Sequence, residues 1–118
     1  MLGPTDVRTL ALALPEAEEA AHFEKTSYRV RGKIFCPVDS VGDSLVLKLD
    51  PEDQHNLVAG RSDAIAPVTG AWGRKGWTQV RLEAVSPEDL AAWLRLAWLA
   101  VAPKRLAATL SSSLHNAG

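Results

Sequence analysis

The chain has 118 residues, of which 47% are hydrophobic and 23% are charged, and its formal net charge is −1. These values exclude a disordered chain and predict one domain that buries about two-thirds of its unfolded surface. A charge so close to zero also argues against a protein whose main activity is non-specific nucleic-acid binding, because phosphate neutralisation needs an excess of Lys and Arg.

Three further features bear on location. Cys36 is the single cysteine, so an internal disulfide is excluded and a reducing cytoplasm is expected. The N-terminus lacks the basic and then apolar layout of a signal peptide. The longest uninterrupted apolar run, residues 96–102, is too short to span a bilayer, so no membrane partner is expected.

The chain is predicted to begin with a helix over residues 5–14, where apolar side chains recur every three or four positions. Thr5 or Asp6 would cap this helix, and Pro15 would end it because proline disfavours helical backbone in the residue before it. Residues 16–24 are acidic and are predicted to form a loop or an edge strand.

A three-stranded antiparallel meander follows, because the apolar period changes to two. The strands are predicted at 27–30, 33–38 and 44–49, with turns at Arg31-Gly32 and at 39–43. The side chains expected on the core face are Tyr28, Val30, Ile34, Cys36, Val38, Leu45, Leu47 and Leu49.

The second half of the chain is predicted to contain a short helix from Asp50 to Gly60 and strands at 64–68 and 77–82. A helix at 87–102 follows, with Ser86 as its cap. Thr78, Val80 and Leu82 would share one face of the last strand, and Trp77, Gln79 and Arg81 would share the other. The predicted order is α-β-β-β-α-β-β-α. Helices on one face of an antiparallel sheet would make an α+β two-layer sandwich, a single domain over residues 1–118 with an ordered core at about 5–110.

Five segments in this order resemble the MmcQ/YjbR family over roughly residues 5–103. They are Ala13-Leu14-Pro15-Glu16, Tyr28-Arg29-Val30-Arg31-Gly32-Lys33-Ile34-Phe35, Leu47-Lys48-Leu49-Asp50-Pro51-Glu52, Lys75-Gly76-Trp77-Thr78-Gln79-Val80 and Ser86-Pro87-Glu88-Asp89-Leu90. The resemblance implies a two-layer α+β fold similar to the frataxin-like CyaY shape and to type III secretion chaperones. It also implies a bacterial DNA-binding protein with a winged architecture and no enzymatic activity.

No catalytic, metal or cofactor site is expected from the residues themselves. His22, His55 and His115 are far apart in the sequence, and no metal-ligand spacing is present. Cys36 lies in an apolar strand, which indicates a buried structural thiol. The chain contains neither a phosphate-binding loop nor a dinucleotide fingerprint.

Two basic hairpins carry the first functional hypothesis, which is weak, salt-dependent DNA binding. The residues expected to contact nucleic acid are Arg29, Arg31, Lys33, Trp72, Arg74, Lys75 and Arg81. Cations at the hairpin tips would contact phosphates, and Trp72 would stack on a base or wedge between bases. The alternative is that these charges only keep two hairpins solvated. We expect Trp77 to anchor the core.

The last predicted helix is apolar on nearly all sides, and Leu96 and Leu99 lie opposite its core stripe. Such a helix is buried on both sides. Either residues 103–114 fold over it, or it forms a homodimer contact through Leu96 and Leu99. The second functional hypothesis is therefore a protein-interaction domain. A third is a small-molecule pocket between the sheet and the helices.

Overall fold

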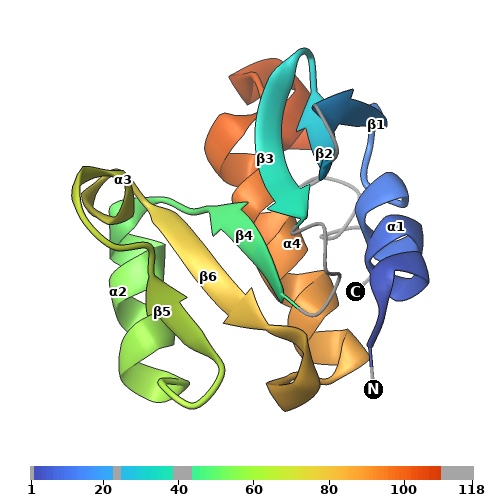
Figure 1. Cartoon of the computed structure of the whole chain (residues 1–118). Coiled ribbons are helices and arrows are strands. Elements are labelled where there is room, and N and C mark those ends of the chain that lie inside the picture. The colour runs from blue at the N-terminus through green and yellow to red at the C-terminus, as the bar shows by residue number, and fades with distance from the viewer. Residues whose placement is uncertain (1, 23–24, 39–43, 110–118) are drawn as a thin grey trace.

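The computed structural model describes residues 2–22, 25–38 and 44–109 (Figure 1). The elements, in chain order, are α1 (Pro4–Leu12), β1 (Ala17–His22), β2 (Lys25–Val30), β3 (Lys33–Val38), β4 (Ser44–Lys48), α2 (Pro51–Gly60), β5 (Ile65–Pro67), α3 (Ala71–Arg74), β6 (Trp77–Arg81), the 3-10 turn η1 (Leu82–Ala84) and α4 (Pro87–Val101). The predicted turn at 39–43 lies outside the described residues.

The strands form one six-stranded antiparallel sheet in the order β1-β2-β3-β4-β6-β5. Helix α4 packs against β3 and β4, α1 lies along α4, and α2 packs against β5 (Figure 1). This arrangement confirms the predicted α+β sandwich with an antiparallel sheet.

The alternation of buried and exposed residues along β4 and β6 divides the sheet into two faces. Leu45 and Leu47 of β4 pair with Val80 and Thr78 of β6, and all four are buried. The opposite residues, Val46 with Gln79 and Lys48 with Trp77, are half-buried or exposed. We call this second side of β4 and β6, which none of the described helices covers (Figure 1), the open face.

The structure decides between the two alternatives predicted for one part of the sheet and corrects the prediction for another. The acidic segment after α1 is a true edge strand, since β1 pairs with β2 along its whole length. In β3 the register passes from Tyr28 opposite Cys36 to Arg29 opposite Ile34, so Phe35 is an inserted residue. This bulge buries Phe35 beside Cys36 and leaves Ile34 half-buried, so the prediction that Ile34 shares the core face with Cys36 was wrong. An edge or a bulge in this strand is what Pro37 suggests from the sequence.

The helix starts are capped by short acidic and hydroxyl side chains. The Ser86 hydroxyl accepts a hydrogen bond from the Asp89 N–H at 3.1 Å, and the Asp50 carboxylate accepts one from the Glu52 N–H at 2.9 Å. Both starts were predicted. Helix α1 begins one residue earlier than predicted, at Pro4, and the Asp6 carboxylate accepts from the Gly3 N–H at 2.8 Å.

The core lies between α4 and the sheet. Leu90, Trp93, Leu94, Ala97 and Trp98 of α4 are buried, as their spacing predicts. The Trp98 indole N–H donates to the Pro15 carbonyl at 2.9 Å, so this large side chain also fixes the segment that follows α1. No helix among the described residues is both long and apolar enough to cross a membrane.

Candidate nucleic-acid interface

Trp72 is the large apolar side chain that the described surface exposes most, at 61% of its full accessibility. It lies in α3, a single helical turn between β5 and β6 (Figure 1). The sequence predicts a bending hairpin tip at this point. The tip that joins the paired strands β5 and β6 contains α3, with Arg74 inside this helix and Lys75 directly after it.

Two glycines hold α3 against the ends of neighbouring strands. A Cβ on Gly73 would lie 1.9 Å from the Val68 carbonyl oxygen, and one on Gly76 would lie 1.8 Å from the Leu49 carbonyl oxygen. Gly76 also has a φ of 106°, a backbone region that favours glycine. The glycine spacing therefore reflects close packing of the backbone.

Hydrogen bonds from the buried Gln54 side chain hold the same loop in place. The Gln54 side-chain amide of α2 donates to the Gly73 carbonyl at 2.9 Å, the Trp77 carbonyl at 3.2 Å and the Thr78 hydroxyl at 2.9 Å. The Thr78 hydroxyl in turn donates to the Gly76 carbonyl at 2.9 Å. Gln54 was not among the predicted site residues, because a polar residue in a short amphipathic helix gives no sign of its partners.

Aromatic rings and ammonium groups alternate around this rigid turn. The Trp72 and Trp77 rings meet edge to face, with 6.1 Å between centroids and an angle of 72° between planes. The Lys75 Nζ lies 5.4 Å from the Trp72 ring centroid, and the Lys48 Nζ lies 5.9 Å from that of Trp77. Both distances are within the range of cation–π attraction.

The Lys48 ammonium also donates to the Lys75 carbonyl, which ties β4 to the end of α3. We call Lys48, Trp72, Arg74, Lys75 and Trp77 together the tryptophan corner. The prediction that Trp77 serves the core holds in part, since its ring is half-buried and contributes to this corner. Lys48 was missed, although the strand alternation already placed it opposite the buried leucines of β4.

The predicted basic residues do not all meet at this corner. Figure 1 shows the turn between β2 and β3 well away from α3, so the two basic segments form separate surfaces. In the turn between β2 and β3, Arg31 forms a bidentate ion pair with Glu16, with nitrogen–oxygen distances of 2.6 and 3.0 Å. The hydrogen bond from Arg31 lowers the pKa of Glu16 below its usual range. Lys33, in the same turn, is exposed.

The other two arginines also have local partners. Arg81 forms an ion pair with Glu83. Arg29 donates to the Ser27 hydroxyl at 3.3 Å and lies opposite Glu18 in the pairing of β1 with β2. These cations are less available to a phosphate than Arg74 and Lys75.

Acidic side chains limit the positive charge near the corner. Asp50, Glu52 and Asp53 open α2 directly after Leu49, the residue that Gly76 contacts. Burial, followed by the charges of Asp50 and Glu52, raises the pKa of Asp53 above its usual range. The corner is therefore basic at its tip and close to neutral over its wider surroundings.

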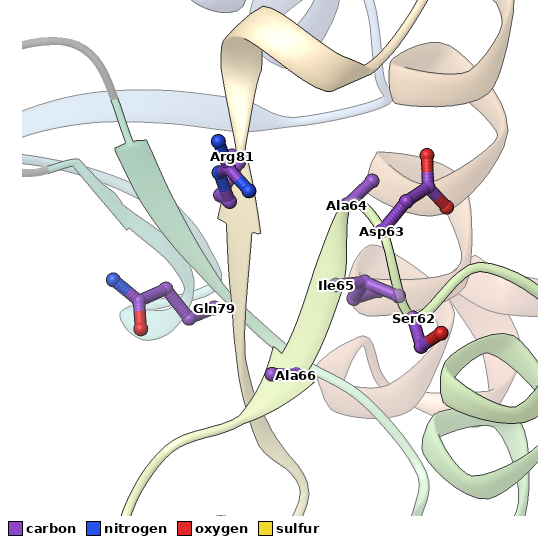
Figure 2. A pocket seen from close by; sticks show the side chains of 7 residues that line it. All are labelled: Ser62, Asp63, Ala64, Ile65, Ala66, Gln79 and Arg81. Atoms are coloured by element: carbon purple, nitrogen blue, oxygen red, sulfur yellow. The ribbon is translucent and has the colours of Figure 1, made fainter.

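A shallow hollow of about 160 Å³ lies farther along the open face, beside the edge strand β5 (Figure 2). Ala66, Gln79 and Arg81 line it from the sheet, and Ser62 and Asp63 line it from the segment before β5. Figure 2 shows the Gln79 and Asp63 side chains on opposite sides of the two strands. The hollow therefore lies at the edge of the sheet, and Gln79 and Arg81, which follow Trp77 along the open face, line one side of it.

The outer side of α4 carries the predicted interface residues. Leu96 and Leu99 are half-buried and pack against the core within the chain. Residues 104–109 are helical, and Leu106 and Ala107 pack against the same core. The beginning of the C-terminal segment therefore packs against the core, and both its folding over Leu96 and Leu99 and a homodimer contact stay predictions.

Two groups that could act as nucleophiles, the Cys36 thiol and the Tyr28 hydroxyl, are buried. Burial raises the pKa of the Cys36 thiol well above its usual range. Burial, together with the nearby Glu19 carboxylate, raises the pKa of Tyr28 to about 12, so both groups stay protonated at neutral pH. Among residues 2–22, 25–38 and 44–109, no three His, Cys, Asp or Glu side chains gather as metal ligands would.

These features define a two-layer α+β protein with one uncovered sheet face and an aromatic and basic corner at its end. The family model YjbR matches residues 12–100, so the chain belongs to the YjbR family. A similar solved structure is that of Deinococcus radiodurans protein DR2400, which contains the domain DUF419. The two share 29% identity and a TM-score of 0.70 over 82% of this chain and 76% of the other. No curated protein matches the chain.

Proposed function

We propose that this protein is a non-enzymatic DNA-binding protein of the YjbR family and that it contacts DNA through the tryptophan corner. One observation carries the proposal, namely the exposed Trp72 ring with the Lys75 ammonium 5.4 Å from its centroid. Exposing a large aromatic ring costs hydrophobic free energy, and a ring beside cations suits a polyanion whose bases can stack.

The corner has the parts that such a contact needs. Lys48, Arg74 and Lys75 supply three cations from two segments of the chain, and none of them forms an ion pair with a described acid. The hydrogen bonds of Gln54 and the close packing of Gly73 hold the loop in place, so binding would cost little ordering entropy.

The turn between β2 and β3 is a weaker candidate. Arg31 would have to release the Glu16 carboxylate before it could bind a phosphate. Breaking this ion pair offsets most of the binding free energy that the new phosphate contact would supply. We therefore assign the first contact to the corner and treat Arg29, Arg31, Lys33 and Arg81 as secondary positions.

The test is the binding of a fluorescently labelled DNA, followed by anisotropy between about 20 and 200 mM salt, a range over which phosphate contacts weaken steeply. With about three phosphate contacts, log Kd should change with log salt by roughly 2 to 3 units per decade. The double variant Arg74→Glu, Lys75→Glu should abolish binding at every salt concentration.

Two single variants serve as controls. Lys104→Glu changes an exposed lysine of the C-terminal segment, and Lys33→Glu changes an exposed lysine of the other turn. Lys104→Glu should bind as the parent does, and Lys33→Glu, at one of the secondary positions, should weaken binding only slightly. Absent binding at low salt would refute the proposal, and a loss caused by Lys33→Glu alone would move the site to the β2–β3 turn.

A further inference from the structure

We infer that the ligand of this surface is a single strand of DNA, laid along the open face from the tryptophan corner toward the hollow beside β5. This inference rests on the proposed function and specifies the form of nucleic acid that the site accepts. It follows from the shape of the open face, the exposure of Trp72 and the distribution of charge.

The open face offers a track of paired residues rather than a single contact. Lys48 pairs with Trp77, Val46 with Gln79 and Ser44 with Arg81, so three successive rows lead away from the corner. The last row lies four residue steps along β6 from the first, or about 13 Å at the rise of an antiparallel strand. A track of this length accommodates a few nucleotides of an extended strand.

Trp72 decides between a single strand and a duplex. In a duplex the flat faces of the bases are covered by their neighbours, whereas an extended single strand presents them to an aromatic ring. The Trp72 ring is exposed and can stack on such a base. The base would then replace the Lys75 ammonium on the ring, and the ammonium could bind a phosphate.

The charge distribution points the same way. Duplex binding depends mainly on the number of phosphates that are neutralised, and the whole chain has a net charge of −1. Along the track, Arg81 is already paired with Glu83, so its far end adds little positive charge. Stacking supplies affinity without further cations, which suits a single strand held by three basic groups at one end.

The middle and far end of the track suit bases and sugars rather than phosphates. Val46 offers an apolar contact, and the Gln79 amide offers both a donor and an acceptor beside the hollow (Figure 2). None of these contacts requires a 2′-hydroxyl group, so we expect no preference for an RNA strand over a DNA strand.

The experiment compares a mixed-sequence strand of about 20 nucleotides, chosen without self-complementarity, with the same strand annealed to its complement and with the RNA strand of that sequence. Binding is measured by anisotropy at fixed low salt and by quenching of tryptophan fluorescence. We expect the DNA strand to bind on the order of tenfold more tightly than the duplex and at least as tightly as the RNA strand.

Variants of Trp72 isolate the stacking contact. Trp72→Ala should weaken strand binding about tenfold, the loss expected for one stacked base, and should remove most of the quenching. Trp72→Phe should retain most of the affinity, and Gln79→Ala should weaken binding less. Because Trp72 and Gln79 are both exposed, circular dichroism should show all three variants folded.

The outcomes separate this inference from the proposed function. Duplex binding equal to or tighter than strand binding would overturn the inference and leave DNA binding intact. A folded Trp72→Ala variant with unchanged affinity would overturn it as well, and tighter RNA binding would overturn the choice of DNA. If neither strand nor duplex binds at low salt, both proposals fail.

Discussion

Arg61 links three parts of the structure through one guanidinium group. It follows α2, donates to Asp89 at the start of α4 at 2.8 Å and to Asp63 before β5 at 3.1 Å, and also donates to the Ala84 carbonyl at 3.0 Å. Its guanidinium carbon lies 5.5 Å from the centroid of the Trp93 ring. One side chain therefore joins the edge of the sheet to the central helix.

These contacts make the stability of the protein dependent on pH. Hydrogen bonds from Arg61 lower the pKa values of Asp63 and Asp89 below their usual 3.8. A carboxyl group with a lowered pKa in the folded state stabilises the protein above its unfolded pKa, and this contribution is lost as the pH falls through the folded value. We expect the free energy of unfolding in urea to decrease from about pH 5 downward.

The variant Asp89→Asn tests whether the ion pair between Arg61 and Asp89 contributes to this pH dependence. It removes the charge but keeps an oxygen that can accept from the Ser86 N–H, so its unfolding free energy should fall less between pH 5 and 3 than that of the parent. Glu88→Gln, at an exposed neighbouring position of α4, is the matched control and should follow the parent. Equal pH dependence of Asp89→Asn and the parent would contradict the role given to this ion pair.

At the scale of single elements, α3 depends on its two glycines more than on its own helix propensity. Gly73→Ala and Gly76→Ala would each press a methyl group into a backbone carbonyl, of Val68 and Leu49 respectively. Either variant should lower the free energy of unfolding by about 2 kcal/mol or more, from overpacking at both sites and backbone strain at Gly76. Chemical denaturation measures the loss.

A third glycine provides the control for this prediction. Gly60 ends α2 with nothing within 4 Å of an added Cβ, so Gly60→Ala should leave the stability unchanged or raise it by about 0.5 kcal/mol. If all three variants were equally stable, the close approach of α3 to the strands would not hold in solution. A selective loss of DNA binding in Gly73→Ala at mild temperature would connect the position of the loop to its function.

The helices and strands that the sequence predicted are those that residues within the same segment determine. The helix α4 follows from its cap at Ser86 and its apolar period, and β4 and β6 follow from strict alternation. The bulge at Phe35 and the single turn α3 have causes elsewhere in the chain. Phe35 is buried by a register shift against β2, and α3 is held partly by Gln54, which is 19 residues away from Gly73 in the sequence.

In the candidate site, too, some features follow from the local sequence and others depend on residues far away in the chain. The exposure of Trp72 and the basic neighbours Arg74 and Lys75 were readable from the segment itself. Lys48 and Trp77 join them only because β4 pairs with β6 in one particular register. Conversely, the pairing of Arg31 with Glu16 depends on how the segment after α1 returns to the β2–β3 turn, which no local pattern encodes.

At the scale of the whole molecule, the apolar outer side of α4 determines the expected oligomeric state. Leu96 and Leu99 are half-buried within the chain, and residues 104–109 bring Leu106 and Ala107 to the same core. A stable dimer buries about 800 Å² on each partner, and the in-chain packing of these leucines reduces the apolar area left for it. We therefore expect a monomer of 12.7 kDa in light scattering at high protein concentration.

A charged residue on the outer side of α4 distinguishes a monomer from a homodimer that uses this helix. In a monomer, Leu96→Glu should lower the free energy of unfolding by about 1 to 3 kcal/mol without changing the mass, since it places a carboxylate in a half-buried apolar site. Ala92→Glu, at an exposed position of the same helix, should change neither quantity much. A parent protein of twice the mass that Leu96→Glu converts to a stable monomer would instead establish α4 as a dimer contact. That result would also leave the tryptophan corner and the open face free in both copies, because α4 packs against the opposite side of the sheet.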